Sequence, residues 1–174
     1  VACVNTVIEL NLGVSNSSYH AAGRDSVDLV VAELLEHPGR DLTYVEQKFF
    51  SMWWERQTDA VKDSVRFLVA NKQLNFANGG WCMHDEASTH YMGMIDQTTL
   101  GHSFLKKELG VIPTVGWQLD PFGHSATQAS LMTAKVGFDA IYFGRIDYQD
   151  LRIRQLEQEC EGLWNGSRSL NDTT

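Results

Sequence analysis

The chain has 174 residues, of which 22 are acidic and 14 are basic, so its formal net charge at pH 7 is −8. This balance argues against a nucleic-acid partner, because phosphate backbones are bound mainly by clustered Lys and Arg, and no such cluster occurs here. The hydrophobic fraction of 43% is typical of a globular chain with a packed core. No stretch approaches the roughly 20 apolar residues of a membrane helix, and the N-terminus lacks a signal-peptide pattern.

The first half of the chain is predicted to alternate between helices and strands. Apolar residues recur at helical spacing over residues 25–36, and a His-Pro-Gly sequence follows them. Residues 42–45 then predict a short buried strand that ends at Glu46. Aromatic and aliphatic side chains spaced along residues 50–69 predict one long helix. Residues 74–77 predict the next strand.

The same alternation continues in the second half of the chain. Residues 91–109 and 125–136 predict helices, and each is followed by a glycine suited to a C-terminal cap. Residues 114–119 and 138–143 predict strands. Strands that alternate with helices at this spacing indicate parallel βαβ units and therefore an α/β fold. Periodicity leaves open whether the sheet is open or closed into a barrel.

Polar and charged residues follow every predicted strand. They are Glu46 after the first strand, His84, Asp85 and Glu86 after the second, Asp120 after the third, and Arg145 and Asp147 after the fourth. In parallel α/β folds, ligands bind at the carboxyl ends of the strands, where the loops share one edge of the sheet. The sequence therefore predicts carboxylates that converge at this edge, although solvated polar side chains also occur there in any such fold.

Residues 116–125, Gly-Trp-Gln-Leu-Asp-Pro-Phe-Gly-His-Ser, are the most informative segment. Asp120 follows an apolar run and precedes Pro121, which prevents the strand from continuing and places the carboxylate on a turn. Such a carboxylate can act as a nucleophile, a base or a metal ligand. The structural alternative is that Asp120 forms an Asx-turn or caps the helix that starts near Ser125. His124 has the corresponding alternative of a hydrogen-bonded histidine at a helix start, in place of a ligand.

Aromatic residues lie near these strand ends, at Trp81, Trp117 and Phe122. A planar ring suits the apolar C–H face of a sugar, so carboxylates combined with aromatics indicate a carbohydrate site. Core packing is the alternative for each of these rings taken singly.

Three sequons of the form Asn-x-Ser/Thr favour a secretory-pathway protein with N-linked glycans, and the alternative is that such short triplets arise by chance. They begin at Asn16, Asn165 and Asn171. The three cysteines, Cys3, Cys82 and Cys160, cannot all pair within one chain, and their spacing matches neither a zinc knuckle nor a small disulfide scaffold. Cysteine usage therefore leaves the compartment open.

Several long blocks of the sequence resemble glycoside hydrolase family 38, and within it the lysosomal-type α-mannosidases. The matching blocks are residues 44–54, 79–87, 117–125, 143–150 and 163–167, in the family's order. The resemblance extends over roughly residues 23 to 170. It implies an α/β fold that is part of a (β/α) barrel with parallel strands, as in the seven-stranded barrel of this family.

The resemblance also implies an activity and a set of site residues. The family hydrolyses terminal α-D-mannosyl residues of N-glycans and oligosaccharides with retention of configuration, uses one zinc ion, and works in the lysosome, the vacuole or outside the cell. Asp120 takes the position of the residue that is both nucleophile and zinc ligand, and Arg145 that of an arginine that keeps this carboxylate ionised. Supporting positions on the same strand-end loops fall on Asp147, Asp85, Glu86, His124 and Trp81.

Parts of the family pattern have no counterpart in this sequence. The family's His-x-Asp block, which supplies two zinc ligands, aligns just before Val1, and its last zinc ligand and its general acid align beyond Thr174. We therefore expect residues 1–174 to be a catalytic domain that is incomplete at both ends, inactive alone, and dependent on the remainder of the same mannosidase chain.

Two other functions stay open on the sequence alone. The first is a catalytically dead or truncated glycan-binding fragment that lacks the zinc loop. The second is a metal-dependent deacetylase or another hydrolase that would use His84, Asp85 and His124.

Overall fold

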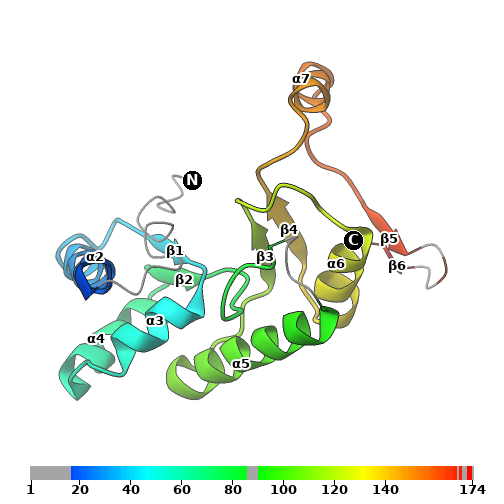
Figure 1. Ribbon diagram of the computed structural model, residues 1–174. Coiled ribbons are helices and arrows are strands. Elements are labelled where there is room, and N and C mark those ends of the chain that lie inside the picture. The colour runs from blue at the N-terminus through cyan, green and yellow to red at the C-terminus, as the bar shows by residue number, and fades with distance from the viewer. Residues whose placement is uncertain (1–16, 86–89, 168, 170–171, 174) are drawn as a thin grey trace.

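Helices and strands alternate along most of the chain in the computed structural model, which describes residues 17–85, 90–167, 169 and 172–173. In chain order (Figure 1) the elements are α2 (Ser17–Glu36), β1 (Leu42–Tyr44), α3 (Gln47–Trp54), α4 (Asp59–Ala70), β2 (Leu74–Phe76), α5 (Tyr91–Leu109), β3 (Val115–Gln118), α6 (Ala126–Ser130), the π-helix η1 (Leu131–Lys135), β4 (Ala140–Phe143), α7 (Tyr148–Glu157), β5 (Asn165–Ser167) and β6 (Asp172–Thr173). None of the described helices is long and apolar enough to cross a membrane.

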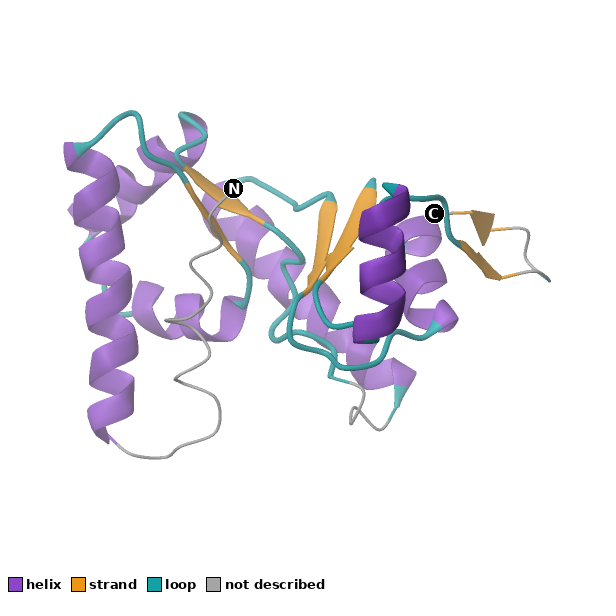
Figure 2. Cartoon of the chain, turned by 90° about the horizontal axis from the view of Figure 1, so that it is seen from above, coloured by secondary structure: helices purple, strands orange, loops and turns teal. Residues whose placement is uncertain are grey.

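The strands of the described residues form three two-stranded sheets. β1 pairs with β2 and β3 pairs with β4, both in parallel, whereas β5 and β6 are antiparallel. Helices α3 and α4 connect the first parallel pair, and α6 with η1 connects the second, as the βαβ pattern predicts. Figure 2 shows the two parallel pairs among the surrounding helices. The mixed α/β class is confirmed, while the described residues do not show a barrel.

Asn78 links the first parallel pair to the second. This buried residue has a positive φ of 58°. Its backbone N–H donates to the Val115 carbonyl over 2.6 Å, and its side-chain oxygen accepts from the Trp117 N–H over 3.5 Å. The His102 Nε2–H on α5 donates to the Asn78 carbonyl over 2.9 Å. The chain after β2 is thereby attached to both β3 and α5.

The hydrophobic core lies between β1, β2 and the helices α2 to α5. Phe50 is at its centre with 1% of its surface exposed. Its ring centroid lies within 6.3 Å of five other aromatic rings, those of Tyr44, Trp53, Trp54, Phe76 and Phe104. Aromatic pairs at such separations stabilise a core beyond the area they bury. This core holds the ends of β1 and β2 in place.

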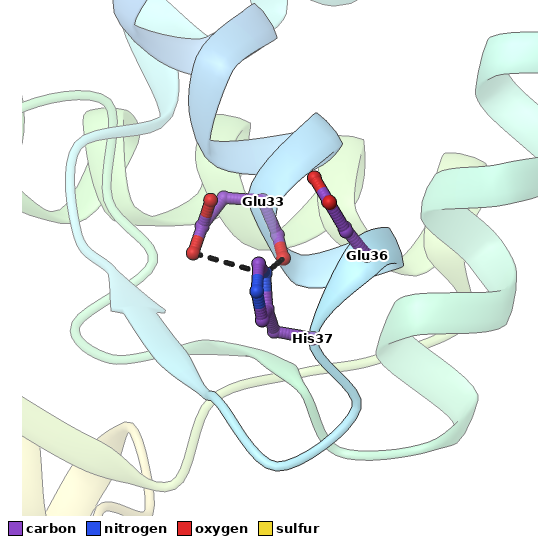
Figure 3. Close-up of side chains that lie close together, drawn as sticks. All are labelled: Glu33, Glu36 and His37. Atoms are coloured by element: carbon purple, nitrogen blue, oxygen red, sulfur yellow. Dashed lines mark hydrogen bonds and ion pairs between the residues drawn. The ribbon is translucent and has the colours of Figure 1, made fainter.

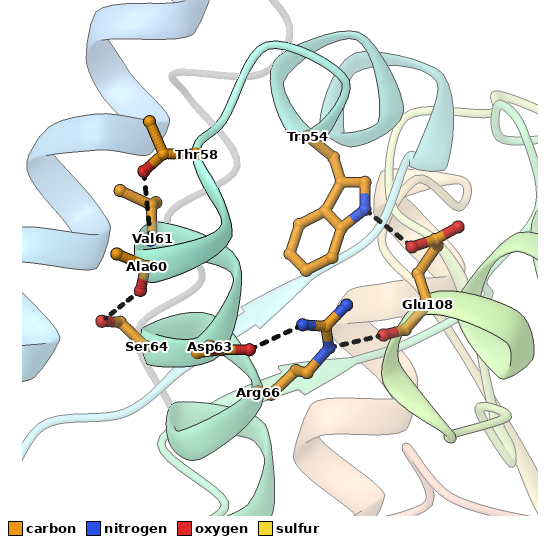
Figure 4. Close-up of polar contacts among 8 residues, drawn as sticks. All are labelled: Trp54, Thr58, Ala60, Val61, Asp63, Ser64, Arg66 and Glu108. Atoms are coloured by element: carbon orange, nitrogen blue, oxygen red, sulfur yellow. Dashed lines mark hydrogen bonds and ion pairs between the residues drawn. The ribbon is translucent and has the colours of Figure 1, made fainter.

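The prediction of one long helix over residues 50–69 is wrong. α3 ends at Trp54 and α4 begins at Asp59, because Thr58 adopts an extended conformation and its hydroxyl accepts a hydrogen bond from the Val61 N–H over 3.4 Å (Figure 4). A threonine cap of this kind starts a new helix. Apolar residues before and after the break face the same core, so the apolar spacing contained no sign of the interruption.

The helix predicted over residues 125–136 changes type within its length. α6 is α-helical, and η1 continues it as a π-helix, in which the Val136 N–H donates to the Leu131 carbonyl over 2.8 Å. The two predicted glycine caps are confirmed. Gly110 ends α5 at φ 74°, and Gly137 follows η1 at φ 97°.

The sequence pattern missed α7, β5 and β6. None of the residues of α7 is buried, and the helix stands away from the rest of the chain (Figure 1), so it has no apolar stripe to detect. The residues that indicate α7 in the sequence are polar side chains that cap the helix or pair along it. The Asp147 carboxylate accepts from the Gln149 and Asp150 N–H groups over 2.9 and 3.1 Å, and Arg154 pairs with Asp150 over 2.8 Å.

A polar cluster joins α3, α4 and α5 beside the core. The Trp54 Nε1–H donates to the Glu108 carboxylate over 3.1 Å, and Arg66 Nε donates to the Glu108 carbonyl over 3.1 Å (Figure 4). The Arg66 guanidinium also lies 5.4 Å from the Trp54 ring centroid. The Trp54 hydrogen bond lowers the pKa of Glu108.

Candidate active site

The turn after β3 presents the Asp120 carboxylate at the strand end that the sequence predicts. Asp120 lies two residues beyond the last residue of β3, and its side chain is 34% exposed. Pro121 behind it is buried. The helix cap that was the structural alternative for Asp120 belongs to Ser125, whose hydroxyl accepts from the Gln128 N–H over 3.0 Å.

Arg145 contacts this carboxylate from the neighbouring loop. Its guanidinium donates to Asp120 Oδ1, and it lies two residues beyond the end of β4. In the parallel register, Gln118 is opposite Phe143, so the two loops leave their strands side by side. The strand register therefore explains why two residues 25 positions apart in the chain meet. The charged guanidinium makes this a charge-assisted hydrogen bond, which restricts the orientation of the carboxylate.

His124 binds the same loop at a second point. Its Nε2 lies 2.8 Å from the carbonyl oxygen of Arg145, and because a carbonyl can only accept, Nε2 carries the proton. The His124 ring centroid is 4.6 Å from that of Phe143, the last residue of β4. His124 is thus a hydrogen-bonded histidine near a helix start, which was the alternative to a ligand role. Its partner, Arg145, is the residue that pairs with Asp120.

The loop after β2 is held by buried polar contacts. His84 is 4% exposed, and its Nδ1 and Nε2 lie 3.0 Å from Gln128 Oε1 on α6 and 3.2 Å from Thr98 Oγ1 on α5. Burial lowers the pKa of the His84 imidazole. The buried Glu46 carboxylate at the end of β1 accepts from the Met83 N–H over 3.0 Å. The partners of His84 lie 14 and 44 residues away, and no sequence pattern indicated them.

Trp81 and Asp147, two other predicted site residues, take part in local packing and capping. The Trp81 ring is edge-on to Phe104 at 6.4 Å, and Lys48 Nζ lies 5.5 Å from its centroid. Asp147 caps α7. The structure thus brings together Asp120, Arg145 and His124, and it places Trp81 and Asp147 in other contacts.

The remaining predicted residues differ in what the structure describes. Asp85 and the sequon residue Asn165, the first residue of β5, are exposed. Glu86, Asn16 and Asn171 lie outside the described residues. Trp117 lies on β3, with its ring centroid 6.1 Å from that of Tyr142 on β4.

Zinc in proteins usually takes three or four side-chain ligands from Cys, His, Asp or Glu. Within the described part of the chain, one group of three such residues has its ligand atoms within 4.8 Å of one another, and it consists of Glu33, Glu36 and His37 at the end of α2 (Figure 3). Glu33 is also paired with Arg40. The described residues around Asp120 therefore do not by themselves fit a complete zinc site.

The arrangement at Asp120 has definite chemical uses. A carboxylate on a turn, paired with an arginine through one oxygen, can attack an electron-poor carbon or bind a cation through its lone pairs. The loop is held by neighbouring strands, which limits the orientations of the carboxylate.

Comparison with known proteins identifies a family. The profile of the glycosyl hydrolases family 38 N-terminal domain matches residues 12–171. Over its whole length the chain is 50% identical to an alpha-mannosidase of Arabidopsis thaliana and 47% identical to the lysosomal alpha-mannosidase of Homo sapiens, and it spans 17% of the length of each. The crystal structure of an alpha-mannosidase from Enterococcus faecalis V583 matches 74% of the chain and 14% of its own length, with a TM-score of 0.61 and 18% identity. At that identity, the structural likeness concerns the fold alone.

Proposed function

Because the chain belongs to glycosyl hydrolase family 38, we propose that it forms part of the catalytic domain of a retaining α-mannosidase, which removes terminal α-D-mannosyl residues from N-glycans and related oligosaccharides. The observation that carries this proposal is the Asp120–Arg145 pair, which lies at the carboxyl ends of two adjacent parallel strands. Ligands of parallel α/β folds bind at this edge. The relatives over which the chain aligns are alpha-mannosidases by name.

Asp120 is the nucleophile in this proposal. One of its carboxylate oxygens forms a bond to the anomeric carbon of the mannosyl residue while the glycosidic C–O bond breaks, and the departing oxygen takes a proton from a general acid. Water then attacks the same carbon and gives its proton to the deprotonated general acid, while the bond to Asp120 breaks, which frees the carboxylate and releases mannose with its configuration retained. Arg145 donates to Asp120 Oδ1 and so orients the carboxylate before the attack. The general acid is assigned to a part of the enzyme outside the described residues.

We propose that the complete enzyme holds one zinc ion, with Asp120 as one ligand and the others from outside the described residues. When bound, such an ion acts as a Lewis acid toward sugar hydroxyls. The support is the oxygen donor of Asp120 at the strand edge together with the family membership of the chain.

The proposed substrates are mannose-containing oligosaccharides, and the proposed structural partner is the remainder of the same polypeptide. The proposed location is the lysosome, the vacuole or the extracellular space. Mammalian relatives are named lysosomal alpha-mannosidases. Asn165 of the second sequon is exposed, as N-linked glycosylation requires. An unchanged mass after enzymatic deglycosylation of the protein from a eukaryotic host would count against this location.

The decisive experiment compares Asp120→Asn with Asp147→Asn in the complete protein. The amide is nearly isosteric with the carboxylate but is a poor nucleophile, so Asp120→Asn should lower kcat for a chromogenic aryl α-mannoside by at least about a thousandfold, or roughly 4 kcal/mol of barrier. Asp147→Asn should cost much less, because asparagine also caps helices well. Metal analysis should find about one zinc in the wild type and less in Asp120→Asn, since an amide is the weaker ligand.

The outcomes separate the proposed enzyme from the glycan-binding alternative. Near-normal turnover by Asp120→Asn would refute its assignment as the nucleophile. A complete wild-type protein that binds mannose oligosaccharides without hydrolysing any aryl α-mannoside would favour the catalytically dead, glycan-binding function.

A further inference from the structure

Two separate contacts join the loops that follow β3 and β4, and both involve Arg145. Its side chain pairs with Asp120, and its backbone carbonyl accepts the hydrogen bond from His124 Nε2 over 2.8 Å. Asp120 and His124 belong to the same turn, four residues apart. The turn that carries the carboxylate therefore also fixes the backbone of the arginine that contacts the carboxylate.

The second contact matters because the first is weak when it stands alone. The Arg145 side chain is 60% exposed, and exposed ion pairs contribute little, since holding a long side chain in one geometry costs conformational entropy. The hydrogen bond from His124 to the Arg145 carbonyl fixes the backbone from which the Arg145 side chain extends, and so limits the positions that this side chain can reach. The His124 ring is itself fixed against Phe143, with 4.6 Å between the ring centroids.

We propose that His124 is a positioning residue for glycosyl transfer, acting through Arg145 to hold the Asp120 carboxylate in the orientation for attack. This inference rests on the proposed function, and it adds a role that the strand-end carboxylates alone do not supply. His124 itself touches neither the substrate nor the reacting atoms in this role. Removing the His124 hydrogen bond lets the Arg145 loop move. The Arg145 guanidinium then no longer holds the Asp120 carboxylate in one orientation.

A positioning role and a purely structural role make different predictions for His124→Ala in the complete protein. Positioning predicts a loss in kcat on the order of 10- to 100-fold, the scale of a misplaced reacting group, while KM stays within about twofold. His124→Gln should recover most of kcat, because its amide N–H can reach the same carbonyl. A structural role would instead lower the melting temperature and leave kcat of the folded protein unchanged.

A double-mutant cycle with Arg145→Ala tests whether His124 acts through the arginine. If it does, His124→Ala should reduce kcat no further in the Arg145→Ala background than Arg145→Ala does alone. His102→Ala is the matched control, because His102 Nε2 donates to the Asn78 carbonyl over 2.9 Å, a bond of the same kind made from α5. We expect His102→Ala to lower the melting temperature and to leave kcat within about threefold, as for a substitution outside the site.

Each outcome either supports or overturns the inference. Loss of kcat, rescue by glutamine and non-additivity with Arg145→Ala together support it. Additive losses in an active enzyme, or an equal loss of kcat in His102→Ala, overturn it and leave the nucleophile assignment standing. A complete wild-type protein without mannosidase activity overturns the proposed function and this inference with it.

Discussion

Gly101 shows how closely α5 approaches the backbone of the chain that follows β2. A Cβ atom at this position of α5 would lie 2.0 Å from the carbonyl oxygen of Gly79 and 2.8 Å from the carbonyl carbon of Gly80. Both neighbours are backbone atoms that cannot rotate away. The absence of a side chain therefore lets α5 pack directly on the chain that follows β2, which leads to His84.

We predict that Gly101→Ala destabilises the protein by roughly 1–3 kcal/mol or more, the cost of overpacking a closely packed site. Gly93→Ala is the matched control on the same helix, because a Cβ at Gly93 meets no atom within 4 Å. There the better helix propensity of alanine should raise stability by up to about 1 kcal/mol. Chemical denaturation of the two variants checks the prediction, and equal effects would contradict the close approach.

At the scale of elements, His84 connects the loop after β2 to two helices. Its ring nitrogens face Gln128 on α6 and Thr98 on α5, and burial is the largest cause that lowers its pKa from about 6.5. The folded state thus binds a proton at this site less readily than the unfolded state does. By linkage, the free energy of unfolding is highest above pH 6.5 and falls as the pH drops below that value.

We predict that His84→Asn flattens this dependence, because asparagine does not titrate. Its stability at pH 7.5 should be lower than that of the wild type, since buried hydrogen bonds are lost, but the decline between pH 6.5 and pH 5 should be smaller. A tenfold difference in proton affinity between the folded and unfolded states corresponds to about 1.4 kcal/mol.

Melting temperatures across this pH range provide the measurement. His90→Asn is the control, because exposed His90 caps α5 and asparagine can cap it as well. An identical pH dependence in His84→Asn and the wild type would show that His84 does not contribute to it.

For the molecule as a whole, many apolar side chains are exposed in the described part of the chain. Leu29 is 70% exposed, Phe67 58% and Leu156 76%. Among the described residues each parallel sheet has two strands, fewer than an independently stable sheet needs without further packing. Exposed strand edges and apolar patches promote association with other chains.

We predict that the 174-residue chain expressed alone associates or unfolds without a sharp transition, and that it hydrolyses no aryl α-mannoside with or without added zinc. The complete protein, purified in parallel, is the control and should be monodisperse and active. Size-exclusion chromatography with light scattering, a thermal melt and the chromogenic assay test this. A monodisperse chain with a cooperative melt would contradict the first part, and zinc-dependent turnover would contradict the second.

Apolar spacing predicted the four strands of the two parallel pairs within two residues, because burial on the core side imposes a local pattern. Apolar spacing failed where a helix ends without any change in the buried face, and where a helix buries no residue. The break at Thr58 lies between two helices that face one core, and α7 buries no residue. Polar capping decides both cases, and its signal is a single residue in each.

Residue types in local order were enough to predict the α/β class and the family resemblance and to single out Asp120, Arg145 and His124. Which of these side chains meet depends on how the strands pair and how the helices pack. Arg145 reaches Asp120 because β4 pairs with β3 in parallel register, and His84 finds its partners because α5 and α6 pack over its loop. Contacts between residues distant in the chain depend on strand pairing and helix packing, and no local periodicity encodes these geometric relations.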